Sequence, residues 1–334
     1  MKINNMLLMF VLPILLIHHV SKAHTNIRTL PFKKVIIWGH KLHSHTHSYI
    51  HYAFYKTFKH LGYDTYWLDN TDEVSTIDFT NSLFITAGQV DQKIPLRNDC
   101  RYILHNCNLE KYQPLFEQNL CILLQVYTHD CIKRNDTKID DCIYMDINNK
   151  ILYMPWATDL LPYEIDAIKK QVSHRKTEDC FYWIGSVWGD NEQGNYDTLN
   201  QFVKACTKNN IKFKQFLFIS PEENIQYMQQ SYLAPALQGQ WQCENGYIPC
   251  RIFKNISYGQ MGITNSKTVY DLFKGKIVYN QDAFQLFYDA QERLRTMDIT
   301  ELYELMDFVR DNHTYINRVQ SLLDFMNIIK PFNN

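Results

Sequence analysis

A chain of 334 residues is long enough for two α/β domains of ordinary size. Its apolar fraction of 46% and aromatic fraction of 14% exclude an intrinsically disordered protein. With 34 Lys and Arg residues against 35 Asp and Glu residues, the formal net charge of -1 gives no support for a nucleic-acid partner.

The N-terminus predicts a cleaved signal peptide over residues 1–23. Lys2 precedes an apolar run over residues 6–17, and small residues at Ser21 and Ala23 suit a cleavage site. The run is shorter than the roughly 20 residues that a membrane-spanning helix needs. A signal anchor, which would tether the protein to a membrane, is the alternative. We therefore expect a protein of the secretory pathway, in the ER or Golgi lumen or secreted.

Two further features agree with an oxidising, lumenal location. The acceptor sequons at residues 135–137 and 312–314 lie in polar contexts and can carry N-linked glycans, whereas the sequon at 255–257 falls inside a predicted helix. The chain has 9 cysteines, and the pairs Cys131 with Cys142 and Cys243 with Cys250 are candidate disulfides.

The first half of the chain, residues 30–165, reads as a Rossmann-like domain. A β-branched run at 34–39 predicts a buried parallel strand, a loop and a helix over 49–61 follow, and a second strand spans 64–69. This is a right-handed βαβ unit. The further strands expected in this half are 82–86, 101–105, 120–127 and 151–155.

A second α/β domain is expected over residues 178–300, after a charged linker or crossing helix at 169–178. The strands expected here are 180–186, 213–219, 261–263 and 276–279, and the helices are 196–208, 221–230, 249–259, 267–273 and 284–297. The C-terminal helices over 301–330 are predicted to pack back on the domains. The fold class is therefore α/β, with two doubly wound domains facing each other across a cleft and a helical tail.

The most specific segment is Pro249-Cys250-Arg251-Ile252-Phe253-Lys254-Asn255-Ile256-Ser257-Tyr258-Gly259. It resembles the donor-binding segment of GT-B glycosyltransferases of the CgeB-like type, which carry P-x-R-[apolar]-F-E-A-[apolar]-A-x-G. The resemblance implies a nucleotide-sugar site, with the donor held by the second domain and the acceptor by the first. Lys254 is a departure, because the family usually has a glutamate there that often reads the nucleotide ribose.

Several residues are expected to bind the donor, because open α/β sheets bind ligands at the carboxyl ends of their strands. Gly185 and Ser186 follow a strand and allow backbone N–H groups to approach a diphosphate, and Trp188 lies in the same loop. The Arg251 guanidinium can hold diphosphate oxygens and neutralise the leaving nucleotide. Lys254 can do the same. Asn265 and Ser266 start a helix, where they either cap it or contact phosphate.

The histidine-rich loop admits three interpretations. His40 or His47 can be the general base that deprotonates the acceptor hydroxyl, and some GT-B families similarly use a histidine after the first strand. His43, His45 and His47 can instead bind a metal, as in hydrolases with an H-x-H motif. The third interpretation is a polar loop whose histidines form only local hydrogen bonds.

These features predict a glycosyltransferase that moves a sugar from a nucleotide-sugar donor to a glycan or protein-linked hydroxyl. The chain has no Asp-x-Asp motif, which metal-dependent GT-A transferases use, so we expect a metal-independent reaction with no cofactor. The alternatives are a metal-dependent hydrolase built on the His43–His47 loop and a non-catalytic glycan-binding protein of the same fold.

Overall fold

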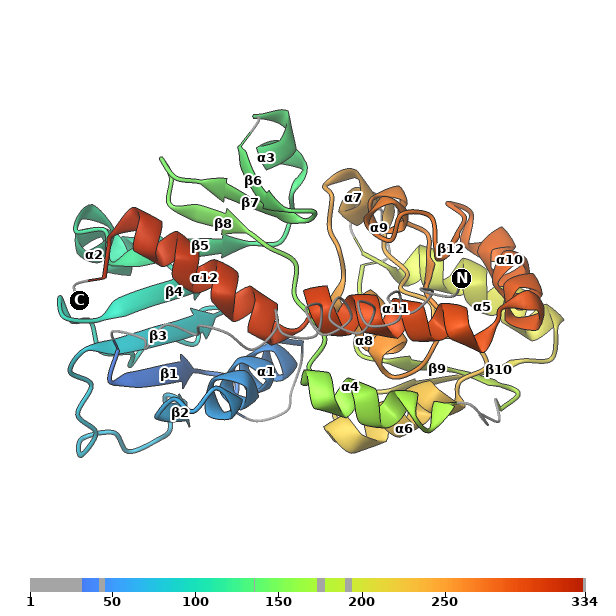
Figure 1. Cartoon of the computed structure of the whole chain (residues 1–334), viewed down its shortest axis with the longest axis horizontal. Helices are drawn as coiled ribbons and strands as arrows, with labels where there is room; N and C mark the ends of the chain where they lie inside the picture. The colour runs from blue at the N-terminus through green and yellow to red at the C-terminus, as the bar shows by residue number, and fades with distance from the viewer. Residues whose placement is uncertain (1–31, 42–45, 135, 173–177, 190–193, 333–334) are drawn as a thin grey trace, which may run out of the picture.

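The computed structural model of the chain describes residues 32–41, 46–134, 136–172, 178–189 and 194–332. They form two α/β halves side by side, each with parallel strands and helices packed against them (Figure 1). The predicted signal peptide at residues 1–23 lies outside the described residues.

The first half is built on one eight-stranded sheet in the order β2-β1-β3-β4-β5-β8-β7-β6. Its strands are β1 Lys34–Trp38, β2 Thr65–Leu68, β3 Ser82–Ala87, β4 Arg101–His105, β5 Cys121–Gln125, β6 Thr137–Asp140, β7 Ile143–Asp146 and β8 Ile151–Tyr153. Its helices are α1 Thr46–His60, η1 Leu109–Tyr112, α2 Gln113–Glu117 and α3 His129–Lys133. The six neighbouring strands β2, β1, β3, β4, β5 and β8 pair in parallel.

Strand β1 is apolar from Val35 to Trp38 because both faces of the sheet are covered there. Val35 and Ile37 pack in one core cluster with Phe54 of α1. Ile36 and Trp38 point to the other face and pack in a second cluster. A strand buried on both faces needs apolar residues at every position, which is why the sequence predicts it well.

The hairpin β6–β7 is a feature that the sequence analysis missed. Strands β6 and β7 pair antiparallel with each other, and β7 pairs antiparallel with β8, which joins the hairpin to the sheet. All four residues of β6 are exposed, so the strand carries no apolar alternation from which to recognise it.

The second half contains the parallel pairs β9–β10 and β11–β12. Its elements are β9 Cys180–Ile184, α5 Tyr196–Lys208, β10 Lys212–Phe216, α6 Pro221–Gln230, α7 Gln240–Glu244, α8 Cys250–Ser257, β11 Ile263–Thr264, α9 Lys267–Leu272, β12 Val278–Tyr279 and α10 Ala283–Thr296. The extended residues 231–236 join the two pairs, because Tyr232 N donates to Cys180 O at 2.8 Å and Ala236 N donates to Ile263 O at 2.8 Å. No strand was expected in these residues.

The chain crosses between the halves twice. It leaves the first half after β8, enters α4 Pro162–Lys169, and returns between α11 Ile299–Asn312 and α12 Tyr315–Ile329. Helix α11 stays with the second half against α4 and α8, whereas α12 lies over the first half against α1 (Figure 1). The two crossings touch, since Thr158 N donates to His313 O at 3.1 Å.

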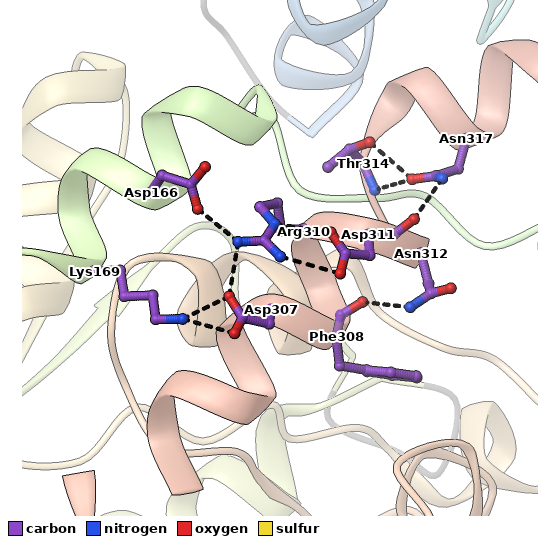
Figure 2. Close-up of polar contacts among 9 residues, drawn as sticks. All are labelled: Asp166, Lys169, Asp307, Phe308, Arg310, Asp311, Asn312, Thr314 and Asn317. Carbon is purple, nitrogen blue, oxygen red and sulfur yellow. Dashed lines mark hydrogen bonds and ion pairs between the residues drawn. The ribbon is translucent and has the colours of Figure 1, made fainter. Parts of the chain in front are cut away.

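Ion pairs align α4 with α11 close to this junction (Figure 2). Lys169 pairs with Asp307 at 2.7 Å, and Arg310 pairs with Asp166 at 2.7 Å. These side chains are partly exposed, so each pair contributes only about 0–1 kcal/mol. Their role is to fix the register of the two helices.

A buried arginine ties the two crossings together. Arg318 of α12 is 0% exposed, and its Nε donates to Pro155 O at 2.8 Å. Its Nη2 lies 3.0 Å from His313 Nδ1. Burial and the Arg318 charge hold the pKa of His313 well below its usual range, so the imidazole is neutral and its Nδ1 accepts the hydrogen bond.

All nine cysteines lie within the described residues, and each is a free thiol there. The predicted disulfides Cys131–Cys142 and Cys243–Cys250 are therefore not formed in the structure. Burial raises the pKa of the Cys131 and Cys243 thiols, to about 12 and about 11, so both are protonated at neutral pH. Among the described residues, no helix is both long and apolar enough to cross a membrane.

The tie at the crossings leads to a prediction about stability. Replacing Arg318 by Met leaves the Pro155 carbonyl without its donor inside the core, and we expect a loss of about 2–4 kcal/mol in the free energy of unfolding. Urea denaturation measures the loss. Arg295→Met is the control, because that side chain is 66% exposed and its replacement should change stability by less than about 0.5 kcal/mol. Equal stability of the two variants would contradict the proposed tie.

Candidate functional site

A cavity of about 190 Å³ lies between the two halves. Its lining includes Thr46 and Tyr49 of α1 from the first half, and Asp159 from the first crossing. The second half supplies the turn after β9 and the start of α8. The lining residues that the sequence predicted for donor binding are Gly185, Ser186, Trp188, Arg251 and Lys254.

The turn after β9 brings the main chain close to Arg251. Gly185 has φ +118°, which side chains rarely adopt, and its carbonyl accepts a hydrogen bond of 2.9 Å from Gln215 Nε2. A Cβ at this position would lie 3.1 Å from Arg251 Nη2. Only glycine therefore allows this turn and this guanidinium to share the same space.

Arg251 lies in the first turn of α8, where Pro249 precedes the helix. Its Nη2 donates to Ile184 O at 2.7 Å, and its guanidinium carbon lies 3.6 Å from the centre of the Trp183 ring. Burial lowers the pKa of Arg251 to about 10, so the group keeps its charge at neutral pH. No carboxylate among the described residues forms an ion pair with it. The cavity wall therefore carries a partly buried cation that has no acidic partner among the described residues.

Lys254 lies one turn further along α8 and does have an acidic neighbour. Its Nζ is 3.9 Å from Asp159 Oδ1 and 4.5 Å from the centre of the Tyr49 ring. Tyr258 donates its hydroxyl proton to the same Asp159 oxygen at 2.6 Å. Tyr49 reaches across the cleft and donates to Ile219 O at 2.9 Å. These contacts join both halves and the crossing segment around one carboxylate.

Aromatic side chains form one edge of the cavity. Trp188 is 48% exposed, and Phe218 in the loop after β10 is 69% exposed. Phe218 also has φ +57°, a conformation that costs non-glycine residues about 1–2 kcal/mol. Both residues line the cavity, so the exposed rings flank its opening.

Asn265 and Ser266 were predicted to bind donor, but neither lines the cavity. The Asn265 side chain accepts from Gln238 N at 2.9 Å and donates to Gln238 O at 2.9 Å. Ser266 is the N-cap of α9 and accepts from Val269 N. The Asn265 side chain thus joins the segment after β11 to the main chain at Gln238, and the Ser266 side chain caps α9.

His40 and His47 are stacked on each other, with ring centres 5.1 Å apart. Two further histidines lie beside them. The ring centre of His51 is 5.3 Å from that of His40, and the ring centre of His105 is 5.9 Å from that of His47. His40 Nε2 lies 3.0 Å from Ala87 O, and a carbonyl only accepts, so this nitrogen carries a proton. Neither His40 nor His47 lines the cavity, although Thr46 and Tyr49 on the same helical turn do.

The alternative metal site cannot be followed through the whole loop. His43 and His45 lie outside the described residues. Among the residues that are described, no group of three His, Cys, Asp or Glu side chains is arranged to hold a metal ion. Burial lowers the pKa of His105, whose Nδ1 bonds Leu124 O at 2.9 Å.

Sequence reasoning missed Asp159, Tyr49 and Tyr258 as residues of the site. Asp159 follows the apolar segment after β8, where a single acidic residue carries no motif. Tyr258 lies inside the recognised segment, at one of its variable positions. The signal that was present is Lys254 itself, because a lysine next to apolar residues of a helix is stabilised by a nearby carboxylate when it becomes partly buried.

Comparison with solved structures supports the predicted architecture. An "alpha-glucosyltransferase in complex with UDP and a 13-mer DNA containing a central A:G mismatch" matches with a TM-score of 0.57 and 10% identity, covering 88% of this chain and 99% of that one. A UDP-forming trehalose-phosphate synthase from Burkholderia xenovorans matches with a TM-score of 0.42 and 11% identity over 74% of each chain. No protein-family model matches the chain, and no curated protein matches it.

The chain therefore has the fold of the GT-B glycosyltransferases, as the sequence predicted. Two Rossmann-like halves face each other. The cavity lies between them, at the ends of strands β9 and β10. At 10% identity, the first of these similarities concerns the fold alone.

The Gly185 turn provides a test of this geometry. We expect Gly185→Ala to destabilise the protein by about 1–3 kcal/mol, because alanine is strained at this φ and its methyl group displaces Arg251. Gly62→Ala is the matched control. Gly62 also has positive φ, +84°, but nothing lies within 4 Å of its added Cβ. Thermal unfolding of both variants separates the two contributions, and a larger loss for Gly62→Ala would contradict the crowding at Gly185.

Proposed function

We propose that the protein is a glycosyltransferase that uses a nucleotide-sugar donor. The observation that carries this proposal is the Arg251 guanidinium, which lines the interdomain cavity without an acidic partner among the described residues. A desolvated cation is costly unless it is paired, so a ligand anion is the natural complement. A diphosphate supplies that anion.

Three neighbouring features suit a diphosphate. Helix α8 begins at the cavity, and its free N–H groups and dipole favour negative charge. Arg251 lies in the same turn and can bind two phosphate oxygens at once. Gly185 lets the main chain after β9 approach the same point without a side chain in between. These parts converge on one end of the cavity.

The proposed reaction transfers the sugar to a hydroxyl of a glycan or of a protein-linked sugar. The hydroxyl oxygen bonds to the anomeric carbon, the bond from that carbon to the diphosphate breaks, and its electron pair goes to the nucleotide. Arg251 and the α8 N-terminus stabilise this developing charge in the cavity between the two halves. They supply the role that a divalent ion has in other transferases, so we propose a metal-independent reaction without a cofactor.

We further propose His40 or His47 as the base that takes the proton of the acceptor hydroxyl. Both belong to the first half, on the acceptor side of the cleft, and His47 lies between two cavity-lining residues, Thr46 and Tyr49. A histidine is suited to this task near neutral pH.

Nucleotide binding tests the proposal. UDP, GDP and CMP are the probes, with UDP first because the similar glucosyltransferase structure contains it. We expect one of them to raise the free energy of unfolding by about 2.7 kcal/mol at a concentration 100-fold above its dissociation constant. The gain should persist in EDTA and disappear in Arg251→Met, and thermal unfolding measures it.

Arg101→Met is the matched control for this measurement. Arg101 also donates to a main-chain carbonyl, Asn119 O at 2.9 Å, but it does not line the cavity. Its replacement should leave the nucleotide effect intact. If no nucleotide stabilises the native protein, or if EDTA alone lowers its stability sharply, the transferase proposal fails.

The proposed secretory location has its own test. Of the two sequons predicted to carry glycans, Asn135 lies outside the described residues and Asn312 is exposed at the end of α11. Asn255 is 3% exposed and donates to Ala234 O at 2.7 Å. In secretory expression of the full chain we expect endoglycosidase to reduce the mass, and Asn312→Gln to remove one glycan. Asn255→Gln should remove none, and an unmodified Asn312 would contradict the prediction.

A further inference from the structure

The cavity contains one acidic side chain among its described lining residues, that of Asp159. Asp159 is 7% exposed and belongs to the crossing between the two halves. A carboxylate this deeply buried needs partners for both of its oxygens. The partners that the protein provides therefore show what remains for a ligand.

The contacts of Asp159 gather on one oxygen. Tyr258 donates to Oδ1 at 2.6 Å, and the Lys254 ammonium is 3.9 Å from the same Oδ1. No hydrogen bond reaches Oδ2 from the residues that the structure describes. The side chain is thus held in place through one oxygen, while the other has room to accept hydrogen bonds.

The chemistry of Oδ2 restricts what can bind there. An ionised carboxylate only accepts hydrogen bonds, so its ligand must donate. Phosphate oxygens are excluded because they are anionic acceptors. The hydroxyl groups of a sugar ring are neutral donors, and two adjacent hydroxyls can bond one carboxylate.

We propose that Asp159 is a specificity-determining residue that binds hydroxyl groups of the nucleotide sugar through Oδ2. This inference rests on the proposed function, because it assumes that the nucleotide diphosphate binds beside Arg251. Lys254 then has a positioning role, since it balances the Asp159 charge beside a second anion. The hydroxyls come either from the ribose of the nucleotide or from the transferred sugar.

The direction in which nucleotide affinity changes in Asp159→Asn separates this proposal from a purely electrostatic role of Asp159. Asp159→Asn removes a negative charge from a cavity that binds a diphosphate. If Asp159 acted only through its charge, the variant would bind nucleotides more tightly. If Asp159 accepts hydroxyl hydrogen bonds, the variant loses charge-assisted bonds and binds more weakly.

The experiment measures dissociation constants by calorimetry for UDP, 2′-deoxyUDP and UDP-glucose. GDP-mannose and CMP are measured in parallel, to cover donors with a guanine or a cytosine base. We expect Asp159→Asn to weaken the preferred ligand by about tenfold or more. If the ribose is the source, the binding of UDP weakens more than that of 2′-deoxyUDP, which lacks one of the two adjacent hydroxyls. If the transferred sugar is the source, only UDP-glucose or its counterpart weakens.

Asp91→Asn is the matched control, because Asp91 is 5% exposed, accepts a hydroxyl bond from Tyr112 and lies 4.0 Å from Lys111, but does not line the cavity. Its affinities should equal those of the native protein. Asp159→Glu keeps the charge and serves if the Asn variant does not fold; moving the carboxylate by one methylene should also weaken binding.

Unchanged or tighter binding of every probe by both Asp159 variants would overturn the assignment while leaving the transferase proposal standing. Failure of the native protein to bind any nucleotide would instead overturn the proposed function, and the assignment of Asp159 with it.

Discussion

The Arg318 guanidinium is the contact on which the arrangement of the two halves depends. It is fully buried, yet it bonds the Pro155 carbonyl of one crossing and the His313 ring of the other. Because those bonds join the two connections between the halves, they set where α1 and α8 face each other. The cavity lies between helices of different halves, and direct contacts such as the 2.9 Å hydrogen bond from Thr128 Oγ1 to Gly246 O position the halves together with this tie.

Within the cavity, charge is distributed unevenly. Arg251 has a carbonyl and an indole ring as partners, whereas Lys254 has the Asp159 carboxylate. Among the described residues only Lys254 has an acidic partner, and this difference is the basis for proposing a ligand anion at Arg251 and hydrogen-bond donors at Asp159. That pattern agrees with the proposed ligand, a diphosphate joined to a hydroxylated ring.

The sequence predicted the elements whose physical cause is local. Strands with a continuous apolar run, such as β1, fall where they were expected, and so do capped helices such as α6 over Pro221–Gln230. The β6–β7 hairpin was missed because its first strand is exposed and polar. The extended residues 231–236 were missed because they become part of a sheet only through bonds to β9 and β11.

For the site, the sequence by itself predicted residues of the second half that the structure places around one cavity. Local sequence signals are enough to predict these parts. Pro249 marks the start of the helix that carries Arg251, and Gly185 marks the turn after a strand. The tertiary structure alone decided that Asp159 faces Lys254, that Tyr49 crosses the cleft, and that Asn265 braces the chain instead of lining the cavity. The physical reason is that these contacts join residues that are 27 to 170 positions apart in the chain, and no local pattern encodes which distant side chain a polar group will meet.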